Sequence, residues 1–219
     1  MSLNSLDIDV VFGGIDFVEK DTKDSGVEEL EDKMLKLYKN KTFHVVQNLD
    51  KIGLPKKNEQ IRIITLRSFN AIAFLQWVQE KSGLIIDEAL FCIYSINHEA
   101  SVIIDQMVKD GKIKTATILM SNLRNKAHRQ KEQMTKDYFI NNPNIELVFA
   151  SSHAKIMSFK IGEDYYTVEG SGNLSYNSRI EQAVIDNDQS LFNFTKSWIE
   201  EIKIYLKDKK ELIIYEKAK

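Results

Sequence analysis

The chain has 219 residues, of which 43% are hydrophobic and 28% are charged, and its formal net charge is −2. These values are ordinary for a globular protein, and the length predicts one large domain or one domain with an N-terminal extension. A net charge this close to zero excludes a strong overall field for nucleic acid or acidic membranes, so any nucleic-acid contact must come from a local patch.

The first 58 residues differ from the rest and predict an N-terminal extension. Residues 6–12 alternate in polarity, which predicts a short strand, and residues 19–33 are strongly charged and mostly acidic, which is typical of a solvated loop. Residues 53–58 combine glycine, proline and asparagine and predict a turn or linker. We therefore predict an extension over residues 1–58 and a main domain over residues 59–219.

Strand-like and helix-like segments alternate through the main domain. The strand-like segments are residues 61–66, 84–86, 88–95, 114–120, 145–149, 155–161, 165–168 and 183–185. The helix-like segments are residues 71–80, 99–109, 124–141 and 191–206. This alternation predicts an α/β fold with a mixed, largely parallel sheet that helices flank on both faces.

Cysteine content and hydropathy bear on the cellular compartment. Cys92 is the one cysteine, and it stands in an apolar run, which predicts a buried thiol. A lone cysteine excludes an internal disulfide framework and fits a reducing cytosol. No run approaches the roughly 18 apolar residues of a membrane span, and no signal peptide is visible. We therefore expect a cytoplasmic protein without a membrane partner.

Small polar residues follow four of the predicted strands. These segments are residues 67–70, 95–98, 121–122 and 151–153. In open α/β sheets, ligands bind beyond the carboxyl ends of strands, so the four segments are candidates for one shared cleft. The alternative is ordinary loop chemistry, since serine and asparagine favour turns.

The strongest chemical pattern begins at His153. A strand places His153 and Lys155 on one face, and the lysine then supplies positive charge beside the imidazole. Downstream, the turn at residues 170–173 (Gly-Ser-Gly-Asn) offers backbone N–H groups, a hydroxyl and an amide to an anionic oxygen. Further on, Glu181 supplies a carboxylate, a group that can fix the tautomer of a histidine.

This pattern resembles the phospholipase D superfamily, whose signature is His-x-Lys, a downstream Asp, and then Gly-Ser-x-Asn. The matching residues are His153, Lys155, Gly170, Ser171 and Asn173. Glu181 stands where nucleases of the family carry the acidic residue that orients the histidine. The order of strands and helices from about residue 60 to residue 206 also resembles one phospholipase D half. The resemblance implies a phospholipase D-like catalytic domain over residues 59–219.

One position departs from the family pattern. The family aspartate, separated from the lysine by four residues, would fall at position 160, which is Lys160. The spacing from Lys155 to the glycine turn is also longer than usual. In the family this aspartate is mainly structural, so its replacement leaves the chemical groups of the motif in place.

The resemblance implies a chemistry and a set of site residues. His153 would attack phosphorus and form a phosphohistidine, and a second histidine would protonate the leaving oxygen. The implied catalytic residues are His153, Lys155, Asn173 and Glu181. The implied substrate-binding residues are Gly170, Ser171, Gly172, Ser175, Arg124 and Lys126. We expect no metal and no other cofactor, because lysine and amide groups neutralise the phosphate oxygens in this family.

The chain carries a single His-x-Lys motif, and this bears on its assembly. Single-motif members of the family pair two identical subunits about a two-fold axis, which would bring two copies of His153 to one cleft. We therefore predict a homodimer. The segment at residues 122–131 is locally basic and could hold a polynucleotide backbone beside the cleft. The alternative for this segment is a solvated helix face.

Two functions follow from these observations. The first is a metal-independent phosphodiesterase, specifically an endonuclease on DNA or RNA. The alternative is a degenerate phospholipase D-like module that binds nucleic acid or a protein partner without catalysis. Lys160 and the acidic N-terminal segment motivate this alternative.

Overall fold

The computed structural model describes residues 40–46, 49, 52–65, 70–121, 137–139, 141–175, 180–208 and 213–214. The chain divides between Lys36 and Leu37 into two compact units, and the described residues all belong to the second. The predictions for residues 6–12, for residues 19–33 and for most of the helix at 124–141 lie outside the described residues.

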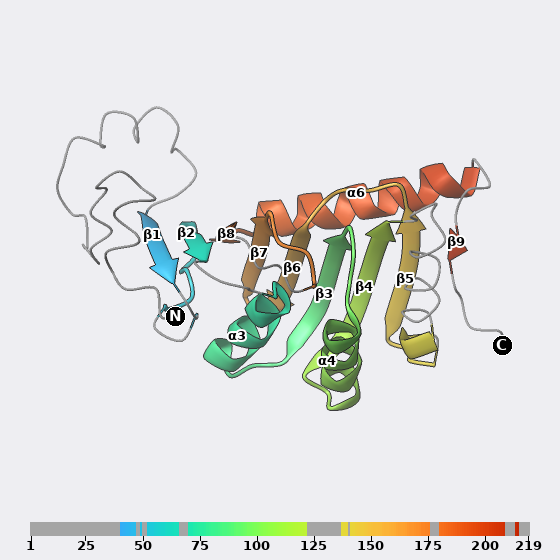
Figure 1. Cartoon of the computed structure of the whole chain (residues 1–219), viewed down its shortest axis with the longest axis horizontal. Helices are drawn as coiled ribbons and strands as arrows, with labels where there is room; N and C mark the ends of the chain where they lie inside the picture. Colours follow the sequence, from blue (N-terminus) through green and yellow to red (C-terminus); the bar gives the residue numbers. More distant parts are fainter. Residues whose placement is uncertain are drawn as a thin grey trace, which may run out of the picture. The chain divides into compact units, whose positions relative to one another are not determined.

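The described residues form one mixed sheet (Figure 1). In chain order its strands are β1 (Asn40–Val46), β2 (Glu59–Thr65), β3 (Ile86–Ile93), β4 (Ile113–Ser121), β5 (Ile145–Ala150), β6 (Ile156–Ile161), β7 (Asp164–Gly170), β8 (Glu181–Asn187) and β9 (Ile213–Ile214). Their order across the sheet is β1-β2-β8-β7-β6-β3-β4-β5-β9. The predicted extension thus contributes one described strand, β1, which pairs in parallel with β2. The predicted domain boundary at residue 58 stays a prediction.

The sheet is mixed as predicted, but the expectation of a largely parallel sheet is wrong. The parallel pairs are β1–β2, β3–β4 and β4–β5. The antiparallel pairs are β2–β8, β3–β6, β5–β9, β6–β7 and β7–β8. A parallel pair needs a long crossover connection, and the turn at Gly162 joins β6 directly to β7, so this pair must be antiparallel.

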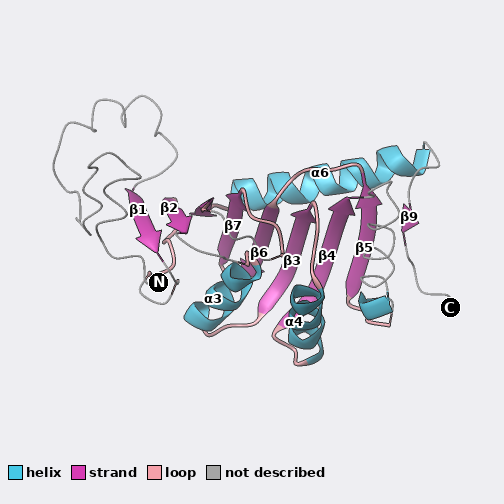
Figure 2. Cartoon of the chain, viewed as in Figure 1, coloured by secondary structure: helices cyan, strands magenta, loops and turns pink. Residues whose placement is uncertain are grey.

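Helices flank both faces of the sheet, as the sequence predicts (Figure 2). The described helices with full bounds are α3 (Ile72–Ser82), α4 (His98–Lys109) and α6 (Gln189–Asp208). Side chains alternate across each strand, so β3 sends Phe91 to the core under α3 and α4, and Leu90 and Cys92 to the core under α6. None of the described helices is long and apolar enough to span a membrane.

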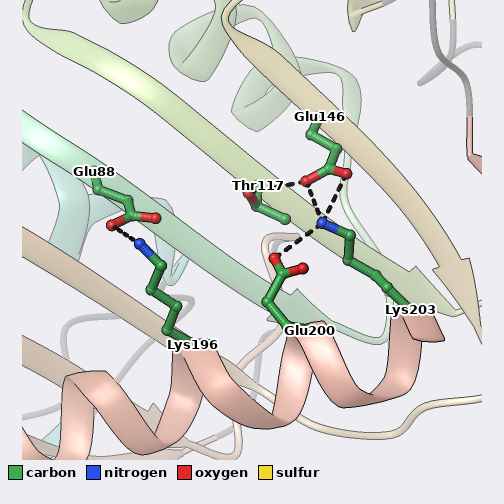
Figure 3. Close-up of polar contacts among 6 residues, drawn as sticks. All are labelled: Glu88, Thr117, Glu146, Lys196, Glu200 and Lys203. Atoms are coloured by element: carbon green, nitrogen blue, oxygen red, sulfur yellow. Dashed lines mark hydrogen bonds and ion pairs between the residues drawn. The ribbon is translucent and has the colours of Figure 1, made fainter. Parts of the chain in front are cut away.

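Two ion pairs fasten α6 to the sheet (Figure 3). Lys203 Nζ lies 2.9 Å from the carboxylate of Glu146 on β5 and 2.9 Å from that of Glu200. Burial disfavours the charged ammonium, but the hydrogen bonds to the two carboxylates outweigh it and raise the pKa of Lys203. Lys196 Nζ lies 2.8 Å from Glu88 on β3. These contacts fix α6 across several strands of the sheet.

Cys92 is predicted to resist alkylation in the folded protein. Its side chain is 0% exposed, which confirms the buried thiol, and burial raises its pKa to about 12. The folded protein therefore keeps the thiol protonated at mildly alkaline pH, where an unfolded chain already forms the reactive thiolate. Mass spectrometry after iodoacetamide treatment should show modification in guanidinium chloride and almost none in native buffer. Equal rates in the two conditions would contradict this prediction.

Candidate active site

His153 lies in the loop that joins β5 to β6. The loop begins after Ala150, and the Ser152 hydroxyl accepts a hydrogen bond from the backbone N–H of Ala154 at 3.2 Å. The His153 side chain is exposed. The expected strand geometry for the His-x-Lys pair is not observed, because β6 begins only at Ile156.

Lys155 nevertheless meets His153, because its side chain folds back along the loop. Lys155 Nζ lies 3.2 Å from His153 Nδ1 and 3.2 Å from the backbone oxygen of His153. A charged lysine can only donate, so Nδ1 accepts, and the neutral imidazole then carries its proton on Nε2. In this arrangement the Nε2 lone pair is not free, and Lys155 must leave Nδ1 before Nε2 can act as a nucleophile.

Tyr94 is the third side chain at this position, and the sequence interpretation did not single it out. Its ring centroid lies 4.6 Å from that of His153, with the planes tilted by 53°. Lys155 Nζ also lies over the Tyr94 ring, 5.8 Å from the centroid. One feature of the sequence could have indicated Tyr94: it stands directly after β3, next to the polar residues that follow this strand.

The glycine turn after β7 is tied to the first residues of β8. The Ser171 hydroxyl donates a hydrogen bond to the carboxylate of Glu181 and accepts one from the backbone N–H of Gln182 at 3.1 Å. The backbone N–H of Ser171 donates to the carbonyl oxygen of Gln182 at 3.0 Å, and that of Gly170 donates to the carbonyl oxygen of Lys155 at 3.3 Å. The turn therefore lies beside the His-x-Lys loop.

The same turn reaches the end of β3. Leu174 forms a parallel bridge with Ile96, and the backbone N–H of Asn97 donates to the carbonyl oxygen of Leu174 at 2.8 Å. Asn97 also caps α4 by accepting from the N–H of Ala100 at 2.9 Å. Ser121 at the end of β4 pairs with Ala150, directly before the motif loop. The predicted segments at 95–98, 121–122 and 151–153 therefore reach the strand ends beside the motif, although residues 67–69 and 122 lie outside the described residues.

Lys155 and Glu181 line one hollow together with Gly170 and Gly172. Its remaining walls are mainly apolar and come from both the β-sheet and α3. Glu181 is only 6% exposed, and its carboxylate accepts from Ser171, whereas Lys155 contacts the His153 ring. Of the predicted site residues, His153 therefore pairs with Lys155, and the predicted substrate-binding residue Ser171 pairs with Glu181.

The other predicted site residues differ in how the structure places them. Asn173 is the last residue of the turn, and its buried Oδ1 has no hydrogen-bond partner among the described residues. Ser175 is half-buried directly after Leu174. Arg124 and Lys126 lie outside the described residues. Within the described residues, no group of three or more His, Cys, Asp or Glu side chains could hold a metal ion.

Lys160 lies at the end of β6 that is distant from the motif. It pairs with Glu88 on β3 and with Tyr165 on β7, and the strand from Lys155 to Lys160 spans roughly 16 Å. The residue that departs from the family pattern therefore does not enter the site that Lys155 and the glycine turn form.

Gly170 is predicted to accept no side chain without a loss of stability, in contrast to Gly172. A Cβ atom on Gly170 would lie 2.4 Å from the backbone oxygen of Gln182, so the β7–β8 pairing would have to shift. We expect Gly170→Ala to lower the free energy of unfolding by about 1–3 kcal/mol, the usual cost of overpacking, and to impair the site. Gly172→Ala is the matched control, because its Cβ would meet Ala71 at an ordinary 3.6 Å. Thermal and denaturant unfolding measure the stability of both variants, and equal stability of Gly170→Ala and Gly172→Ala would contradict the prediction.

Comparison with known proteins gives a likeness in fold. No family model matches the chain, and no curated protein matches it either. The chain is similar to Nuc of Salmonella typhimurium, a phospholipase D family member. The match has a TM-score of 0.46 and 14% identity, and it covers 71% of this chain and 99% of Nuc.

Two further solved structures are similar to the chain over part of their length. For phosphatidylserine synthase of Haemophilus influenzae the TM-score is 0.45 and the identity is 10%, with 71% of this chain and 39% of the synthase covered. For polyphosphate kinase of Porphyromonas gingivalis the TM-score is 0.42 and the identity is 11%, with 55% of this chain and 22% of the kinase covered. At these identities the likeness concerns the fold alone.

Proposed function

We propose that the chain is a metal-independent phosphodiesterase of the phospholipase D type that cleaves DNA or RNA through His153. The observation that carries the proposal is an exposed imidazole whose Nδ1 lies 3.2 Å from an ammonium group, next to a glycine turn. A nucleophile and a fixed positive charge are two of the groups that phosphoryl transfer requires.

The proposed reaction has two steps. The Nε2 lone pair of His153 attacks phosphorus, a P–N bond forms, and the bond from phosphorus to the leaving ester oxygen breaks. That oxygen takes a proton from the imidazolium of the partner subunit's His153. Water then attacks phosphorus and gives a proton back to the partner's His153, while the P–N bond breaks and its electron pair returns to Nε2.

Substrate binding prepares His153 in this scheme. A phosphodiester carries a full negative charge, so its oxygen competes for the ammonium group that now contacts Nδ1. Once Lys155 turns to that oxygen, the imidazole can adopt the tautomer with a proton on Nδ1 and a free lone pair on Nε2. An Nδ1–H needs an acceptor, and we propose the carboxylate of Glu181 for this role, with Asn173 and the turn at Ser171 as further phosphate contacts.

A homodimer is part of the proposal, because one chain supplies one motif histidine and the reaction uses two. A two-fold axis beside the exposed His153 ring would provide the second. The basic segment at residues 122–131, with Arg124 and Lys126, favours a polynucleotide as substrate. We also propose that the protein is located in the cytoplasm.

The test is cleavage of plasmid DNA and of single-stranded RNA in EDTA, combined with light scattering at micromolar concentration. We expect cleavage that survives EDTA and a mass of two chains. Tight binding without turnover of any diester would instead support the non-catalytic module. A strictly monomeric protein that still cleaves would contradict the two-histidine mechanism.

A further inference from the structure

Tyr94 joins a rigid part of the fold to the exposed histidine loop. It follows Ile93, which is 1% exposed and pairs with Met120 in the interior of the sheet. Two residues later, the bridge from Ile96 to Leu174 fixes the chain again. The backbone of Tyr94 is therefore held on both sides, whereas His153 stands exposed in a connecting loop.

The ring of Tyr94 contacts both members of the His-x-Lys pair. The imidazole lies against it at 4.6 Å between centroids, and the ammonium group lies over it at 5.8 Å. Both contacts are favourable, because the face of an aromatic ring is negative and attracts a cation, and tilted ring pairs avoid repulsion between their faces. The three side chains thus form a closed triangle, in which the 3.2 Å contact of Lys155 with Nδ1 is the third side.

The ring rather than the hydroxyl makes these contacts. Within the described parts of the chain, the Tyr94 hydroxyl forms no hydrogen bond, so phenylalanine at this position would retain both contacts. Without an aromatic ring, two long exposed side chains would have to give up rotamer freedom for one hydrogen bond, which is unfavourable in water.

We propose that Tyr94 is a positioning residue that holds His153 and Lys155 together and fixes the resting imidazole in the tautomer with its proton on Nε2. Its importance for turnover rests on the proposed function, because the catalytic use of His153 is part of that proposal. The contact and the tautomer do not depend on it, and they can be measured in the resting protein.

The experiment compares the wild type with Tyr94→Phe and Tyr94→Leu. Histidine ring ¹⁵N chemical shifts distinguish an acceptor Nδ1 from a protonated one, and a His153→Ala spectrum identifies the signals among the four histidines. We expect wild type and Tyr94→Phe to show one tautomer, with Nδ1 unprotonated and Nε2–H. Tyr94→Leu should show averaged shifts of a tautomer mixture, because the contacts that hold Lys155 at Nδ1 are lost.

Each outcome bears on one proposal alone. If wild-type Nδ1 carries the proton, the positioning role is wrong, whether or not Tyr94→Leu folds. If Tyr94→Leu keeps the wild-type shifts, the role is also wrong, and an equal change of shifts in Tyr94→Phe would assign the effect to the hydroxyl. If the shifts change as expected but no diester is cleaved by the wild type, the proposed function fails and the positioning contact stands.

Discussion

Replacing His153 with alanine is expected to lower the rate of phosphodiester cleavage by at least about 10⁴-fold, because the variant loses the nucleophile and the general acid together. The side chain is exposed, so the free energy of unfolding should hardly change. Initial rates on a fluorescent oligonucleotide in EDTA measure the first effect, and thermal unfolding measures the second.

A matched control for this variant is His98→Ala. His98 is also an exposed histidine, but its ring contacts Tyr138, with 4.9 Å between the centroids, and the hydroxyl of Tyr138 bonds to its Nε2. We expect its cleavage rate to stay within about twofold of the wild type, because the His98 ring contacts Tyr138 and not the His153–Lys155 pair. A comparable loss in both variants would show that removal of an exposed imidazole acts on the fold rather than on the reaction.

Mixed dimers distinguish a shared site from two separate sites. Wild-type and His153→Ala chains that carry different affinity tags can be coexpressed and purified as mixed pairs. If one reaction uses both copies of His153, the mixed dimer should be nearly as slow as the dimer of two variant chains. A mixed dimer with about half of the wild-type rate would mean that each chain holds a complete site.

The sequence predicts the local features of the fold and the motif well. Alternation within β3 separates Phe91 from Leu90 and Cys92, so both the strand and its two buried faces follow from the pattern. Helix α4 likewise follows from its periodicity, and the structure adds Asn97 as its capping residue. These features depend on residues that are neighbours in the sequence.

The features that sequence reasoning missed depend on distant partners. The neighbours of β8 are β2 and β7, and no local pattern specifies the direction of those pairings. The contact of Tyr94 with His153 joins the ends of β3 and β5, which a single sequence does not place side by side. The bond from Ser171 to Glu181 likewise exists because β7 and β8 are paired at this end.

Replacing Lys155 with methionine is expected to lower the cleavage rate by about 10²–10³-fold, the usual cost of removing one preorganised donor to a developing charge. Methionine keeps most of the aliphatic stem, so packing in the hollow beside Gly170 should be retained. The loss should appear mainly in kcat, because the ammonium group is proposed to neutralise the charge that develops on the phosphate oxygens in the transition state.

Lys160→Met is the matched control for this charge, since it removes the same group from β6, the strand that follows Lys155. Lys160 belongs to β6, opposite Glu88 and Tyr165, and the strand places it roughly 16 Å from position 155. If the substrate needs only positive charge on the protein surface, both variants should bind it less tightly, and KM should rise to a similar extent in each. A site that uses the ammonium group at His153 would lose kcat in Lys155→Met alone. Equal kinetics of the two lysine variants would therefore contradict the proposed role of Lys155 beside His153, even if the protein cleaves diesters.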